Sequence, residues 1–157
     1  MLIKQLLDED FVNYKKSSMF IGFPKCSWKC DKEYGMQVCQ NGTLATSISK
    51  EIGVKTILNR YINNSITSAI CCGGLEPFDT WNDLYELITN IRILTQDDIV
   101  IYTGYYKEEI KEYIDKLKVF PNIIIKFGRY IPSQEKHYDE VLGVYLASDN
   151  QYAERIS

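Results

Sequence analysis

The chain has 157 residues, of which 45% are hydrophobic, and this length and composition predict one domain with a buried core and argue against a two-domain enzyme. Its 18 Lys and Arg residues nearly balance 21 Asp and Glu residues, so the net charge of −3 argues against binding to nucleic acid through bulk electrostatics. The single histidine, His137, disfavours a His-rich zinc site or a hydrolytic triad, and an odd number of cysteines, five, disfavours a secreted disulfide framework.

The chain begins MLIKQLLDEDFVNYKK, which contains acidic residues and no apolar run long enough for a signal peptide or a membrane span. We therefore expect a cytoplasmic protein, in which thiols stay reduced and clustered cysteines more often hold metal or do chemistry. We expect neither a membrane nor a nucleic acid as a partner.

Short apolar runs and helix-spaced apolar residues alternate along the chain. Residues 17–23 predict a buried strand, and residues 24–42 predict a loop that contains three of the cysteines. The hydroxyls of Ser47 and Ser49 predict the start of a helix that ends near residues 63–64. Residues 66–72 then predict a second apolar strand, which two glycines end.

A second helix is predicted to begin at Asp79 or Thr80 and to continue to Ile91. A strand at residues 99–102, a helix at 107–118 and a strand at 123–125 follow. This alternation predicts βαβ units and one α/β domain, residues 1–157, with a mostly parallel sheet and outer helices. Ligands of such sheets bind at the carboxyl ends of the strands, where both the cysteine loop and the two glycines are expected.

Three cysteines follow the first strand, with three residues between Cys26 and Cys30 and eight between Cys30 and Cys39. Three thiolates on one loop can surround a metal centre, and they leave one iron of a 4Fe-4S cluster free to bind a substrate. The alternatives are three unrelated thiols or a structural zinc site, although a fourth ligand and paired C-x2-C knuckles are absent. The spacing favours the cluster.

The pair Cys26 and Cys30 resembles the first half of C-x3-C-x2-C, the motif that follows the first strand of radical S-adenosylmethionine (SAM) enzymes. Cys39 is followed by a polar pair, Gln40 and Asn41, similar to the end of that motif. Residues 31–38 are therefore interpreted as the family's two-residue interval with a six-residue insertion. The resemblance implies that the three cysteines ligate a 4Fe-4S cluster and that the methionine amine and carboxylate of SAM chelate the fourth iron.

The resemblance also implies that residues beside the third cysteine contact SAM. Family members often carry an aromatic residue immediately before this cysteine, near the adenine, and Val38 occupies that position here. Tyr34 in the insertion is a candidate substitute, with simple loop filling as the alternative. Gln40 is the other candidate SAM contact on this loop.

The letters GGLEP at residues 73–77 resemble the family's G-G-E-P segment. The resemblance implies that backbone groups around Gly73, Gly74 and Glu76 receive the amino group of the SAM methionine. Glycine suits this role because it lets backbone approach a ligand closely. Thr103, at the end of a later strand, is implied to line the adenosine site, and a turn with a satisfied hydroxyl is the alternative.

Two further cysteines, Cys71 and Cys72, lie in the second predicted strand. Adjacent strand residues point to opposite faces, so we expect one thiol to face the interior of the fold and the other to face the helices. Both are predicted to be core thiols, and a radical relay or an extra ligand is the alternative.

Segments near residues 98–110, 123–130 and 146–151 resemble the activating component of anaerobic ribonucleoside-triphosphate reductase, a short radical-SAM subfamily. The resemblance extends over about residues 10–155. It implies a small incomplete (βα) barrel of the radical-SAM type, since 157 residues are too few for a full eight-stranded barrel.

The implied function is reductive cleavage of SAM to a 5′-deoxyadenosyl radical, with no catalytic residue separate from the cluster. In this subfamily the radical abstracts a hydrogen from a glycine of a partner, so the implied partner is a glycyl-radical enzyme such as anaerobic ribonucleotide reductase. A flavodoxin or ferredoxin-like protein would donate the electron. The alternatives are a compact radical SAM enzyme that acts on a small molecule, and a degenerate iron-sulfur protein with a structural or electron-transfer role.

Overall fold

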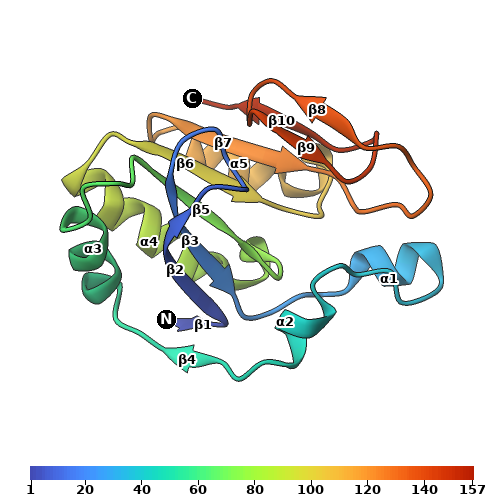
Figure 1. Cartoon of the computed structure of the whole chain (residues 1–157), viewed down its shortest axis with the longest axis horizontal. Helices are drawn as coiled ribbons and strands as arrows, with labels where there is room; N and C mark the ends of the chain where they lie inside the picture. The colour runs from blue at the N-terminus through green and yellow to red at the C-terminus, as the bar shows by residue number, and fades with distance from the viewer.

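The computed structural model describes residues 1–157 and has a six-stranded sheet at its centre (Figure 1). The sheet order β10-β7-β6-β5-β3-β2 comprises β2 (Gln5–Asp10), β3 (Ser18–Phe23), β5 (Ala69–Gly74), β6 (Asp98–Tyr102), β7 (Ile123–Phe127) and β10 (Tyr152–Arg155). The four inner strands are parallel, and the edge strands β2 and β10 pair antiparallel. The predicted mixed α/β architecture with a mostly parallel sheet is confirmed. Its finer form, an incomplete barrel, stays a prediction.

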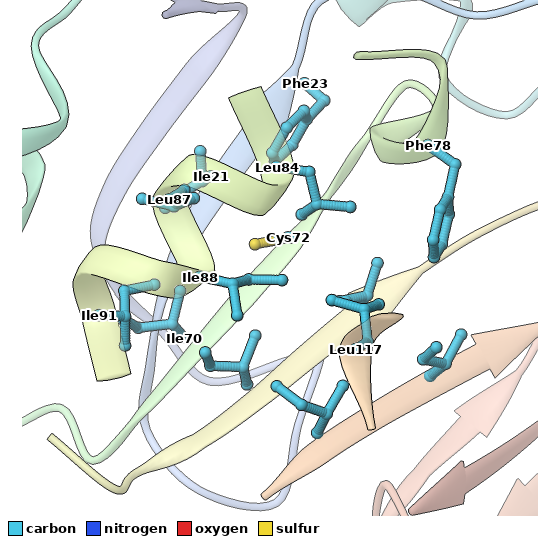
Figure 2. Close-up of a cluster of buried hydrophobic side chains, with 14 of the residues drawn as sticks. Ile21, Phe23, Ile70, Cys72, Phe78, Leu84, Leu87, Ile88, Ile91 and Leu117 are labelled. Atoms are coloured by element: carbon cyan, nitrogen blue, oxygen red, sulfur yellow. The ribbon is translucent and has the colours of Figure 1, made fainter. Parts of the chain in front are cut away.

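Three helices cover one face of the sheet, namely α3 (Val54–Ile62), α4 (Trp81–Leu94) and α5 (Lys111–Leu117). The strands alternate, so every second residue points at these helices, and the sulfur of Cys72 lies among Leu84, Ile88 and their neighbours beneath α4 (Figure 2). The side chains of this core are buried, and it is the larger of the two apolar clusters, which makes it the largest source of hydrophobic stabilisation in the fold.

The opposite face carries a smaller apolar cluster in which Cys71 and Val100 pack against Tyr14 and Leu142. A two-stranded hairpin, β8 (His137–Asp139) and β9 (Val144–Leu146), contributes to this layer. The prediction that Cys71 and Cys72 are core thiols on opposite faces is therefore confirmed. Because no helix covers this face, side chains near the strand ends remain open to a cleft.

Several predicted boundaries are wrong by a few residues. The second strand begins at Ala69 rather than residue 66, and the helix expected at 107–118 begins as a 3₁₀ turn, Lys107–Ile110. Gly53 precedes α3, and the serines predicted to cap it lie before the short strand β4 (Lys50–Glu51), which pairs with β1 (Leu2–Ile3). Thr80 does precede α4, as the last residue of a 3₁₀ turn at Pro77–Thr80, but its hydroxyl makes no capping bond.

The segment expected to be a loop, residues 24–42, contains one short helix and the start of another. These helices are α1 (Lys29–Tyr34) and α2 (Gly42–Thr46), and neither buries a side chain in the core. In Figure 1 both lie beyond the carboxyl end of β3. None of the helices in the chain combines the length and the apolar character needed to cross a membrane.

Candidate functional site

A cleft of about 320 Å³ lies at the carboxyl ends of the parallel strands. Its lining residues include Cys30, Cys39, Gly73, Gly74, Thr103 and Lys126. They come from the cysteine segment and from the ends of β5, β6 and β7. The expectation that the cysteine loop and the glycine turn meet at one edge of the sheet is confirmed, and the volume falls at the small end of the usual range for ligand pockets.

All three cysteines of the loop are half-buried. The Cys26 Sγ accepts a hydrogen bond from the Trp28 amide at 3.3 Å, and the Cys39 Sγ accepts one from the Asn41 amide at 3.4 Å. Burial raises the pKa of the Cys26 thiol to about 12 and also raises the pKa of Cys39. Without a metal these two thiols are therefore protonated at neutral pH, and ligation must release their protons.

Cys30 lies in α1, close to the start of the loop that follows β6. A β-carbon added to Gly104 would lie 3.4 Å from the Cys30 Sγ, so the sulfur is close to the backbone at the end of β6. Cys26 lies near the carboxylates of Glu76 and Asp79, and it is not among the residues that line the cleft.

The thiols of the loop do not form a site for a single metal ion. No three His, Cys, Asp or Glu side chains converge on one point where a single metal ion would bind. A cluster does not require such convergence, because each thiolate binds a different iron. Backbone N–H···S hydrogen bonds, which Cys26 and Cys39 both accept, are among the interactions that set cluster potentials. The donor chemistry of the loop therefore fits an iron-sulfur cluster.

The glycine turn is fixed by backbone geometry. Gly74 has a φ of 80°, and a β-carbon there would lie 2.8 Å from the Gly22 Cα, so only glycine fits without displacing backbone. The side-chain amide of Asn41 donates to the Gly74 carbonyl oxygen at 2.6 Å. This bond connects the residue two positions after Cys39 directly to the turn.

The buried side chain of Glu76 connects the ends of β5 and β6. Its carboxylate accepts hydrogen bonds from the Thr103 hydroxyl at 2.8 Å, the Gly104 amide at 2.9 Å and the Phe78 amide at 3.2 Å. Burial outweighs these bonds and raises its pKa to about 7. Its side chain does not line the cleft, and neither does Val38, whereas Gln40 does.

Sequence reasoning missed Lys126, a buried lysine that lines the cleft. Its Nζ donates to the Gly128 carbonyl oxygen at 2.9 Å, and burial lowers its pKa to about 8. A lysine near the end of the apolar strand IIIKF was the available signal, because buried lysines are rare unless they have a partner. The ammonium group can pair with an anionic group in the cleft.

Sequence reasoning also missed what holds α1 in place. Arg129, which is only 5% exposed, pairs with Glu33 at 3.0 Å and with Glu109 at 2.7 Å, and Lys29 also pairs with Glu109, at 2.9 Å. Burial alone would raise the pKa of Glu109, but the hydrogen bonds from Arg129 and Lys29 outweigh it and lower the pKa to about 2. These contacts attach the helix that carries Cys30 to the end of the sheet.

A parallel α/β sheet with a three-cysteine loop at its carboxyl edge fits the class of iron-sulfur proteins. Comparison with known families agrees, since the model of the 4Fe-4S single cluster domain family matches residues 16–151. The match covers most of the chain, and the protein therefore belongs to this family. No curated protein and no solved structure shows a significant match to the chain.

Proposed function

We propose that the protein is a radical SAM enzyme, in which Cys26, Cys30 and Cys39 ligate three irons of the 4Fe-4S cluster. The observation that carries the proposal is the cleft, which two of these thiols line together with the glycine turn and a buried lysine. A structural or electron-transfer cluster needs no such cleft, whereas a cluster with a vacant iron needs space for a ligand beside it.

The residues of the cleft have separate roles in this proposal. Backbone groups at Gly73 and Gly74 approach the methionine amine, since no side chain intervenes there. Lys126 pairs with the methionine carboxylate through its buried ammonium group. Gln40 and Thr103 line the remaining space, and Glu76 keeps the turns after β5 and β6 together.

When bound, the cluster would supply an electron to the sulfonium of SAM, which splits the C5′–S bond into methionine and a 5′-deoxyadenosyl radical. The chain contributes orientation of the sulfonium and exclusion of water from the cleft. We further propose that the radical abstracts a hydrogen from a glycine of a partner enzyme, anaerobic ribonucleotide reductase being the example from the resemblance, and that a flavodoxin or ferredoxin-like protein donates the electron.

Anaerobic reconstitution with iron and sulfide, followed by SAM and dithionite, tests the proposal. The expected products are 5′-deoxyadenosine and methionine in equal amounts. A bound cluster with no SAM cleavage would contradict the enzyme proposal and favour an electron-transfer role, and zinc binding without iron would contradict the cluster itself. More 5′-deoxyadenosine with the partner enzyme than with small metabolites, together with an EPR-detectable glycyl radical on the partner, would support the activase over a small-molecule enzyme.

A further inference from the structure

The eight residues between Cys30 and Cys39 are closed into a loop by one carboxylate. Asp31 Oδ1 accepts hydrogen bonds from the Val38 amide at 2.8 Å and from the Cys39 amide at 2.9 Å. Asp31 follows Cys30 directly in the chain. The carboxylate therefore connects the neighbour of the second candidate ligand to the backbone of the third.

The backbone that follows Asp31 turns back toward Asp31 before it reaches Cys39. Helix α1 ends at Tyr34, and the next residue, Gly35, has a φ of 77° and donates its amide to the Asp31 carbonyl oxygen at 2.9 Å. Asp31 thus accepts hydrogen bonds at two points of this turn. Its main-chain carbonyl accepts from the amide of Gly35, and its side chain accepts from the amides of residues 38 and 39. A β-carbon at Gly35 would meet nothing within 4 Å, so its conformation rather than its surroundings requires glycine.

We propose that Asp31 is a positioning residue that places Cys39 within reach of the cluster across the long interval. The inference rests on the proposed assignment of Cys39 as the third ligand. A flexible interval of this length would let the third thiol adopt many positions, and two charge-assisted hydrogen bonds remove that freedom. The Asn41 amide, which donates to the Cys39 sulfur, and the Asn41 side chain, which donates to Gly74, hold the other side of the same cysteine.

The other acidic residue of α1 provides a matched control. Glu33 lies in the same helix, is more exposed, and pairs with Arg129 rather than with the backbone beside Cys39. Glu33→Gln removes one negative charge from the helix, as Asp31→Asn does, and it removes one exposed ion pair of Arg129, which keeps its pair with Glu109. It leaves the two amide bonds to Asp31 intact. Asp31→Asn keeps an oxygen that can accept those bonds, whereas Asp31→Ala removes it.

Hydrogen exchange of the metal-free protein tests the geometric part. In Asp31→Ala we expect the Val38 and Cys39 amides to exchange about tenfold faster or more, because their acceptor is lost. Asp31→Asn should retain part of the protection, and Glu33→Gln should leave both amides as they are in the unmodified chain. Unchanged exchange in Asp31→Ala would overturn the proposal.

Reconstitution tests the consequence for the cluster through iron and sulfide content and the EPR spectrum of the reduced cluster. We expect Asp31→Ala to lose most of its iron, Asp31→Asn to recover much of it, and Glu33→Gln to bind a full cluster. Full iron content with an unaltered EPR spectrum in Asp31→Ala would overturn the positioning role. Cys39→Ala separates the ligand assignment of Cys39 from the positioning role of Asp31. An unchanged cluster in Cys39→Ala would overturn both the ligand assignment and the inference. Cluster loss in Cys39→Ala but not in Asp31→Ala would overturn the inference alone.

Discussion

At the scale of single residues, Gly74 is the position in the cleft where backbone conformation leaves least freedom. An alanine there would need a left-handed φ, which costs ~1–2 kcal/mol, and its β-carbon would lie 2.8 Å from the Gly22 Cα and 2.9 Å from Leu44 Cδ2. We expect Gly74→Ala to lower the free energy of unfolding of the metal-free protein by about 2 kcal/mol or more, as measured by urea denaturation.

The neighbouring Gly73 is the control for that prediction. A β-carbon at Gly73 would contact side-chain atoms of Phe20 and Tyr102 at 3.2 and 3.4 Å, and no left-handed φ is involved. Gly73→Ala should therefore cost less stability than Gly74→Ala. Equal losses for the two variants would contradict the conformational argument.

Lys126 supports a second prediction about a single residue. Lys126→Met keeps the length of the side chain and removes a buried charge, so the metal-free protein should be as stable as before or slightly more stable. If Lys126 pairs with the carboxylate of SAM, the dissociation constant for SAM should rise about tenfold or more in the reconstituted variant. Equilibrium dialysis measures this change. Lys107→Met, which removes an exposed pair with Glu154, should leave SAM binding unchanged.

At the scale of elements, α1 depends on polar contacts rather than on burial, because none of its residues is buried. Arg129→Gln would remove both ion pairs of the guanidinium and its stacking on the Tyr106 ring. We expect α1 to open more often, and cleavage after Lys29 and Lys32 by a lysine-specific protease to accelerate about tenfold in the metal-free protein.

The remainder of the fold should tolerate that change, because Arg129 lies outside both apolar clusters. The rate of cleavage in Lys107→Gln, which breaks an exposed ion pair elsewhere, provides the comparison. If Arg129→Gln and Lys107→Gln were cleaved at the same rate, the ion pairs of Arg129 would not be what holds α1.

The same contrast explains which elements the sequence could predict. Strands β3, β5, β6 and β7 and helices α3, α4 and α5 form the apolar core, so the strands carry short apolar runs and the helices carry apolar residues at helical spacing. Helix α1 and the edge strand β2, with the sequence QLLDED, carry neither pattern, because their contacts are polar or lie at an edge. Long-range ion pairs such as that between Glu33 and Arg129 leave no local pattern.

The features of the candidate site also divide into those that the sequence could predict and those that it could not. The rule that ligands bind at the carboxyl ends of parallel strands was enough to bring the cysteine loop and the glycine turn together. It could not reveal that the Glu76 carboxylate is occupied by three internal hydrogen bonds, or that Lys126 enters the cleft from β7. Both facts depend on the register between neighbouring strands, which the apolar pattern of a fully buried strand does not specify.

At the scale of the whole molecule, Asp98 holds both ends of the chain to the middle of the sheet. Its carboxylate, at the start of β6, accepts hydrogen bonds from Tyr14 at 3.0 Å, from Arg155 at 2.8 Å and from Lys16. Burial alone would raise its pKa, but these bonds outweigh burial and hold the pKa below its usual value of 3.8. The carboxylate therefore stabilises the folded protein only while it is ionised.

We expect Asp98→Asn to lower the free energy of unfolding by about 1–3 kcal/mol at pH 7, because two of its three partners, Lys16 and Arg155, are charged. A carboxyl whose pKa is lower in the folded than in the unfolded protein contributes stability above its unfolded pKa and loses it as pH falls toward the folded value. The difference between Asp98→Asn and the unmodified chain should therefore shrink between pH 7 and pH 3 in urea denaturation. Asp115→Asn, which removes an exposed pair with Lys118 at 3.6 Å, should have little effect at either pH, and an equal difference at both pH values for Asp98→Asn would show that its charge is not what connects the two ends of the chain.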